Sequence, residues 1–137
     1  MNSIVDIQEE LVSAFELLED PTDKYNYIIE LGSRLPPFPS AFYTDAHLIK
    51  GCQSKVWLSA SQEDGSMVYL ADSESLLVKG LAAIMIKVLS RQKPQDILKA
   101  DLSFIERIGL NNMLSMNRAN GFASLIQNMQ RAAQSAL

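Results

Sequence analysis

Residues 55–71 read KVWLSASQEDGSMVYLA, and this stretch decides the fold. Two runs rich in β-branched, aromatic and aliphatic side chains, residues 55–60 and 67–71, flank a polar segment that contains Asp64 and Gly65. Asp-Gly between two such runs is a strong hairpin signal, because a tight turn needs residues that accept positive φ angles. The sequence therefore predicts two antiparallel strands, and Leu48-Ile49 is a candidate for a third.

The segments on both sides of this hairpin have the three- to four-residue spacing of amphipathic helices. They are residues 4–18, 21–35, 77–89 and a longer stretch from about Ser115. Ser3 is a candidate N-cap and Pro21 fits a first helical position, whereas three prolines make residues 36–47 an irregular connection. Strands grouped in the middle with helices on both sides predict an α+β fold with a small antiparallel sheet of about three strands.

Size and charge exclude several classes of protein. The chain has 137 residues, of which 47% are hydrophobic, so we expect residues 1–137 to form a single domain with its own core. A net charge of −4 repels phosphate backbones, and the basic residues are scattered without interleaved aromatics. A nucleic-acid partner is therefore not expected.

One cysteine and one histidine exclude further site types. Structural zinc and iron–sulfur clusters usually take four Cys or His ligands, so Cys52 and His47 cannot build either site alone, and no intrachain disulfide is possible. A lone thiol suits a reducing cytosol, and the acidic start of the chain argues against a signal peptide. No apolar run approaches the ~18–20 residues that span a bilayer, so we expect a cytoplasmic protein without a membrane partner.

Cys52 is the candidate reactive residue. Gly51 precedes it, and Lys50 and Lys55 lie two residues before and three after it, a setting in which nearby cations would lower the thiol pKa and increase its nucleophilic fraction. The alternative is that Cys52 is a small buried hydrophobe, as free cysteines often are. Local composition leaves both interpretations open.

Three other residues raise questions that the sequence alone does not answer. His47 suggests a Cys–His dyad, but its spacing from Cys52 is uninformative, so we assign it no role. Gly121 lies inside an expected helix, where glycine costs up to ~1 kcal/mol relative to alanine and indicates close packing or the approach of a partner. Arg118 is a poor match to the helix dipole near a helix start, so it either forms an ordinary ion pair or points toward a site that attracts an anion.

Four segments together carry a resemblance to a known family. They are GCQSKVW at residues 51–57, KYNYIIELGSRLP at 24–36, Asp72-Ser73 followed by VKGL at 78–81, and RANGF at 118–122. Any one could arise by chance, but four in this order make the chain resemble the SufE family, including its CsdE branch. The resemblance covers roughly residues 24–130; residues 36–46 follow no recognised motif, and the family pattern does not require His47.

The resemblance implies a SufE/NifU-like α+β protein that accepts sulfur from a cysteine desulfurase of the SufS or CsdA type. Cys52 matches the acceptor cysteine, which would become a persulfide by an exchange like that of thiols with disulfides. The family is further expected to stimulate the desulfurase and to deliver sulfur to a downstream iron–sulfur scaffold. No cofactor is expected on this chain, because the pyridoxal phosphate belongs to the desulfurase.

Supporting or partner-binding roles are implied for five further residues. They are Gly51, Gln53, Ser54, Asp72 and Arg118. We expect the desulfurase to dock around residues 51–54, and a homodimer is left open. Two alternatives compete with a sulfur carrier: a cysteine-dependent hydrolase or thioltransferase, for which turnover depends on His47, and an interaction protein in which Cys52 is dispensable.

Overall fold

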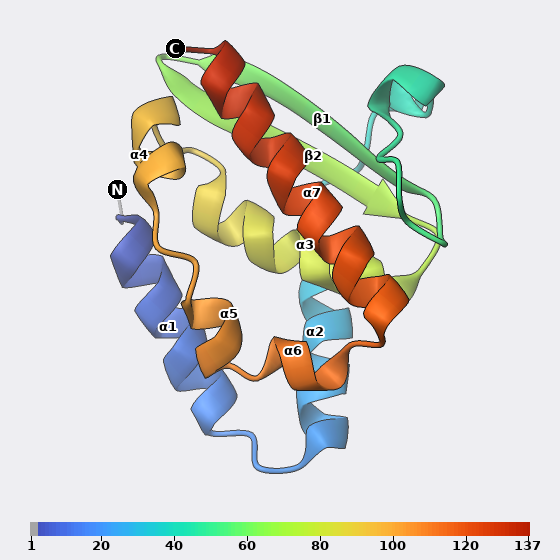
Figure 1. The fold of residues 1–137 in the computed structure, drawn as a ribbon, viewed down its shortest axis with the longest axis vertical. Coiled ribbons are helices and arrows are strands. Elements are labelled where there is room, and N and C mark those ends of the chain that lie inside the picture. The colour runs from blue at the N-terminus through green and yellow to red at the C-terminus, as the bar shows by residue number, and fades with distance from the viewer. Residues whose placement is uncertain (1–2) are drawn as a thin grey trace.

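The computed structural model describes residues 3–137 and confirms the α+β class, with one hairpin among several helices (Figure 1). Strands β1 (Val56–Glu63) and β2 (Ser66–Ser73) pair antiparallel along their whole length. Asp64 and Gly65 form the turn with φ angles of 52° and 81°, as the Asp-Gly signal predicts. The hairpin is therefore where the sequence placed it.

The sheet has two strands within the described part of the chain, where about three were expected. Leu48 forms only an isolated antiparallel bridge with Trp57, and the Ile49 amide donates a hydrogen bond to the Val56 carbonyl at 2.8 Å. Gly51, at a φ of 90°, then turns the chain away from the strand edge. A two-residue contact is too short to continue as a strand.

The helices agree with the expected periodicity. They are α1 (Ile4–Glu16), α2 (Pro21–Ser33), α3 (Leu76–Leu89), α4 (Pro94–Lys99), α5 (Phe104–Arg107), α6 (Leu110–Met113) and α7 (Met116–Ser135). The N-cap side chains of Ser3, Asp20, Ser75 and Ser115 each accept a backbone N–H bond, so the four longest helices begin at satisfied caps. Residues 36–47 are irregular as expected, with short 3-10 turns η1 (Ser40–Phe42) and η2 (Asp45–His47).

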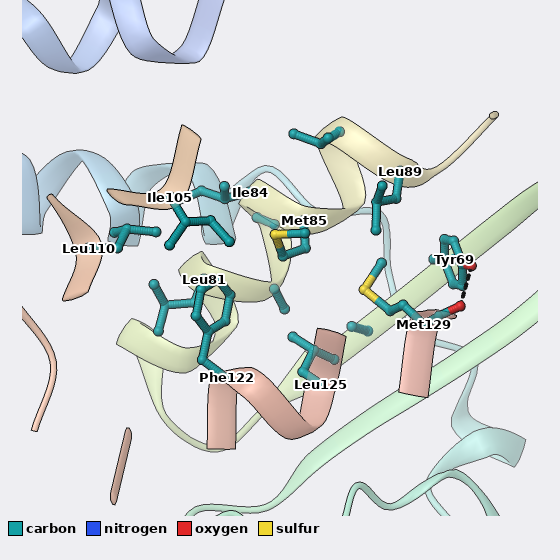
Figure 2. Close-up of a cluster of buried hydrophobic side chains, with 14 of the residues drawn as sticks. Tyr69, Leu81, Ile84, Met85, Leu89, Ile105, Leu110, Phe122, Leu125 and Met129 are labelled. Carbon is teal, nitrogen blue, oxygen red and sulfur yellow. Dashed lines mark hydrogen bonds between the residues drawn. The ribbon is translucent and has the colours of Figure 1, made fainter. Parts of the chain in front are cut away.

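Helix α7 crosses one face of the hairpin, with α3 packed beside it and α1 and α2 farther from the strands (Figure 1). The buried side chains between these elements form one hydrophobic cluster. Within this cluster the Tyr69 hydroxyl donates a hydrogen bond to the Met129 carbonyl at 2.6 Å, which ties β2 to α7 (Figure 2). Burial raises the pKa of Tyr69 to about 12, so this hydroxyl keeps its proton at physiological pH.

Helices α2 and α3 cross with their backbones in contact. A Cβ atom added to Gly80 would lie 2.2 Å from the Ile28 carbonyl oxygen, and one added to Gly32 would lie 2.8 Å from the Gly80 amide nitrogen. No side chain fits between the two helices at this point. The crossing fixes α3, whose first turn forms part of the site described next.

Candidate functional site

Cys52 lies in a loop, residues 50–55, that is held at both ends. The Ser124 hydroxyl of α7 donates a hydrogen bond to the Lys50 carbonyl at 2.7 Å. At the other end, the Ser73 hydroxyl and the Glu74 amide donate to the Lys55 carbonyl at 2.8 and 3.1 Å. We call residues 50–55 the cysteine loop; it is fixed between α7 and the end of β2.

The thiol of Cys52 rests against the backbone of α7. Its Sγ lies 3.6 Å from the Gly121 carbonyl oxygen, to which the S–H donates. A Cβ atom on Gly121 would lie only 3.1 Å from Sγ, closer than carbon and sulfur normally approach. Close packing, one of the two explanations offered for a glycine inside this helix, is therefore confirmed.

A cavity of about 70 Å³ opens beside the thiol. Its walls come from the cysteine loop, the start of β1 and the first turns of α3 and α7. The lining residues are Cys52, Gln53, Ser54, Val56, Val78, Leu81, Asn117, Arg118, Gly121, Phe122 and Leu125. A water molecule needs roughly 10–15 Å³ of such space, so the cavity has room for a small group bonded to Sγ.

Burial raises the pKa of the Cys52 thiol in this conformation. The expectation that Lys50 and Lys55 would lower that pKa is therefore wrong for the closed loop, because both lysines are exposed and the half-buried sulfur loses solvent stabilisation of its anion. None of the lining residues is a carboxylate or a histidine, so the cavity itself offers no general base. A raised pKa favours the protonated thiol, so this conformation disfavours the thiolate form of Cys52.

Arg118 lines the cavity and does not form the ordinary ion pair that was one of its two expected roles. Its backbone amide donates a hydrogen bond to the Ser115 hydroxyl, the N-cap of α7. Within residues 3–137 its guanidinium forms no salt bridge with a carboxylate. The first turn of α7, which carries Arg118, also contributes a positive dipole end beside the cavity.

Gln53 and Ser54 line the same cavity, but Asp72 lies elsewhere. In the hairpin register Asp72 is opposite Trp57, on the face of the sheet that turns away from α7. Its carboxylate accepts hydrogen bonds from the Tyr43 hydroxyl and the Ser73 amide, and Lys79 Nζ lies 3.3 Å away. Burial alone would raise the pKa of Asp72, but these hydrogen bonds and the lysine charge together hold it below its ordinary value.

Asp72 therefore joins the irregular segment 36–47 to the sheet and to α3. The Tyr43 ring also packs edge-on against Trp57, with ring centroids 5.0 Å apart. Asp72 and the cysteine loop are connected only through neighbouring residues, since Ser73 donates to Lys55. Any contribution of Asp72 to the site acts through the position of the loop.

His47 makes local contacts. Its ring stacks on Phe42 with centroids 4.7 Å apart, and its Nδ1 lies 3.0 Å from the Thr44 hydroxyl. His47 is not among the residues that line the Cys52 cavity. The geometry gives no support to a Cys–His dyad.

Ser124 was not singled out from the sequence, and Ser73 was quoted only as part of the Asp72-Ser73 segment, without a role. Ser124 lies three residues after Gly121, and this i,i+3 spacing places both on one face of α7. That signal was readable, but only once Gly121 had been matched with the cysteine loop. Nothing in the pattern around Ser73 indicated which carbonyl it would bind.

Neither a metal-binding cluster nor a membrane-spanning helix occurs in the described part of the chain. No three His, Cys, Asp or Glu side chains in residues 3–137 are grouped to hold a metal ion. No helix in this range is both long and apolar enough to cross a bilayer.

Comparison with known proteins gives consistent matches. The sequence profile of the SufE family, described as an Fe-S metabolism associated domain, matches residues 9–133. The chain is 37% identical over 126 residues to SufE-like protein 1, chloroplastic/mitochondrial, of Arabidopsis thaliana, covering 91% of this chain and 34% of the plant protein. It is also 34% identical over 125 residues to the cysteine desulfuration protein SufE of Wigglesworthia glossinidia brevipalpis, covering 90% and 87%.

Two further matches extend over nearly the whole chain. An uncharacterized SufE-like protein of Rhizobium meliloti (strain 1021) is 33% identical over 134 residues, covering 94% of this chain and 96% of its own length. The solution structure of a hypothetical protein from Thermus thermophilus superposes with a TM-score of 0.79 at 18% identity, covering 95% of both chains, which shows a shared fold. With the family profile covering residues 9–133, the chain belongs to the SufE family.

Proposed function

We propose that this protein is a sulfur acceptor that receives persulfide sulfur from a cysteine desulfurase onto Cys52. The observation that carries the proposal is the placement of the chain's sole thiol in the lining of a small cavity that Arg118 also lines. One relative carries the name cysteine desulfuration protein SufE, which supports a desulfurase as the partner.

The transfer is a thiol–persulfide exchange. The Cys52 thiolate attacks the outer sulfur of the desulfurase persulfide, a new S–S bond forms at Cys52, and the old S–S bond breaks so that the desulfurase cysteine leaves as a thiolate. The electron count is unchanged, because one S–S bond replaces another. The desulfurase thiolate that leaves can take up the proton that Cys52 loses. No external oxidant or reductant is needed, because the number of S–S bonds does not change.

The cavity would hold the transferred sulfur after the loop closes. Val56, Leu81 and Phe122 line the cavity with apolar surface, which would limit access of water and of other thiols to a persulfide. Arg118 and the first turn of α7 would stabilise its negative charge. Gln53, Ser54 and Gly51 would shape the loop for entry of the desulfurase persulfide.

This function has consequences for partners and compartment. Pyridoxal phosphate acts on the desulfurase and not on this chain, and the loaded Cys52 passes sulfur onward to iron–sulfur cluster assembly. A thiol carrier works best in a reducing compartment such as the cytosol. Neither step requires a second copy of the chain, so a homodimer is optional.

Alanine formation by a cysteine desulfurase tests the proposal. With cysteine in excess, we expect the wild-type protein to increase the rate severalfold by removing sulfur from the desulfurase, and Cys52→Ser to have no stimulating effect. His47→Ala should behave like wild type, because His47 does not line the Cys52 cavity. Equal stimulation by wild type and Cys52→Ser would contradict the proposal and favour a non-covalent interaction protein.

A further inference from the structure

Two large apolar side chains are exposed at the starts of the two helices that help to line the Cys52 cavity. Leu76 is 65% exposed and Met116 is 81% exposed. Each is the first residue of a helix, α3 or α7, whose first turn lines the cavity. Both helices begin on the same side of the molecule, next to the cysteine loop (Figure 1).

Their direction explains their exposure. Side chains in a helix lean toward its N-terminus, so a side chain at the first position extends beyond the helix end instead of back onto the core. Single exposed apolar residues are common on soluble proteins and carry no message by themselves. Here, however, Leu76 lies two residues before Val78 and Met116 directly before Asn117, and both Val78 and Asn117 line the cavity beside the one thiol of the chain.

Three cations that are unpaired within the described part of the chain lie in the cysteine loop and in the first turn of α7. Lys50 and Lys55 of the cysteine loop and Arg118 of α7 form no ion pair among residues 3–137, and Glu74 is the neighbouring carboxylate. The chain as a whole has a net charge of −4, so these three cations contrast with the charge of the whole chain. Complementary charge at an interface raises the association rate and fixes orientation.

Resting on the proposed function, we propose that Leu76 and Met116 anchor the docking of the desulfurase, and that the desulfurase face they meet has apolar pockets bordered by carboxylates. Met is enriched at protein interfaces, and the buried centre of an interface is more apolar than its rim. The anchors would sit on either side of Cys52 and align the thiol with the desulfurase persulfide. The lysines would mainly increase the rate at which the two proteins associate, before the apolar contacts form.

Binding of a cysteine desulfurase from the same organism tests this inference by calorimetry. We expect Leu76→Ser and Met116→Ser each to raise Kd about tenfold, consistent with the loss of one buried aliphatic side chain. Leu17→Ser is the matched control, because Leu17 is 84% exposed at the end of α1, outside the cavity lining, and should leave Kd unchanged. Lys50→Glu should lower the association rate and flatten its dependence on salt.

A second readout separates this inference from the proposed function. The wild type and Leu17→Ser should both receive sulfur on Cys52, and circular dichroism should show wild-type melting for Leu76→Ser and Met116→Ser, since both side chains are exposed. Wild-type affinity in both variants would contradict the proposal that Leu76 and Met116 anchor the desulfurase, and would leave the acceptor function of Cys52 unaffected. Failure of the wild-type protein itself to receive sulfur would overturn the proposed function, and the docking inference with it.

Discussion

The α2–α3 crossing and the seat of Cys52 on α7 both depend on a glycine within a helix, but the neighbours of those glycines differ. At Gly80 the contact is the carbonyl of Ile28, which belongs to another packed helix. At Gly121 the contact is a side chain on a loop. In both places the absence of a Cβ atom lets a neighbouring group come close to the helix backbone.

The difference indicates which contact can open. Neither backbone at the crossing can move without separating two helices and the core between them. The cysteine loop is held by hydrogen bonds at its ends, from Ser124 to Lys50 and from Ser73 to Lys55, and each such bond contributes only about 1 kcal/mol. The crossing is therefore a permanent part of the fold, whereas the seat of Cys52 is suited to release.

Gly80→Ala should have the largest effect on the fold. The new Cβ would overlap the Ile28 carbonyl, so α2 and α3 must separate, at a cost of about 3 kcal/mol that exceeds the gain of ~1 kcal/mol in helix propensity. Urea unfolding followed by circular dichroism measures the loss. A variant as stable as the wild type would show that the α2–α3 crossing can adjust, and that it does not differ in this respect from the contact between Cys52 and α7.

Gly121→Ala should release the thiol and leave the fold intact. The free energy of unfolding should stay within about 1 kcal/mol of wild type, because the loop yields and alanine favours the helix. In the wild type, alkylation of Cys52 should have its pH midpoint above the ordinary thiol value of ~8.5, since burial raises the thiol pKa. In Gly121→Ala that midpoint should fall toward the ordinary value, and the rate at neutral pH should rise about tenfold.

The neighbouring exposed position offers a control for this variant. Asn120→Ala changes the same turn of α7 without adding an atom against Sγ, so its alkylation profile should match that of the wild type. If the midpoint of Gly121→Ala does not move, the contact with Sγ is not what shields the thiol. Because the folded-state pKa is raised, thiol burial also predicts that wild-type stability declines as pH rises through that pKa.

Ser124→Ala should loosen one end of the loop. Loss of the bond to the Lys50 carbonyl should cost about 1 kcal/mol and raise the alkylation rate by about two- to threefold. Amide hydrogen exchange of the cysteine loop should accelerate, with Ser61→Ala on exposed β1 as the control. Unchanged exchange would mean that the Ser73 end alone holds the loop.

Asp72→Asn should have the smallest effect. It removes the charge that pairs with Lys79, a partly exposed pair worth less than about 1 kcal/mol. The pKa of Asp72 is lowered in the folded protein, so its contribution is present at neutral pH and is lost as pH falls below the ordinary aspartate value. Thermal melts of the wild type and of Asp72→Asn at about pH 7 and about pH 3 measure how much the ionised carboxylate contributes to stability. A large loss of loop order at neutral pH would make Asp72 part of the site.

The sequence predicted the elements of the fold better than their contacts. Hairpin and helix starts were readable because Asp64-Gly65, Ser3, Pro21 and Ser115 act within a few residues. The sequence could not show whether Leu48-Ile49 forms a strand or only a single bridge, because the length of the pairing depends on where the chain turns away at Gly51. Tertiary packing decided that point.

The site was predicted in part. Gly121 was identified as a position of close contact, but nothing local could show that the contact is Cys52. The lysines beside Cys52 suggested a lowered pKa, whereas burial, which only the folded structure determines, raises it. The surroundings of Asp72 likewise depend on strand register, which places its side chain on the face away from α7.

The assignment of Cys52 as the sulfur acceptor is tested most directly by the mass of the intact protein, measured under non-reducing conditions after incubation with a cysteine desulfurase and cysteine. We expect the wild type to gain the mass of sulfur, a thiol reductant to reverse the gain, and Cys52→Ser to show none. No gain in the wild type with an active cognate desulfurase, or an equal gain in Cys52→Ser, would contradict the assignment of Cys52 as the sulfur acceptor.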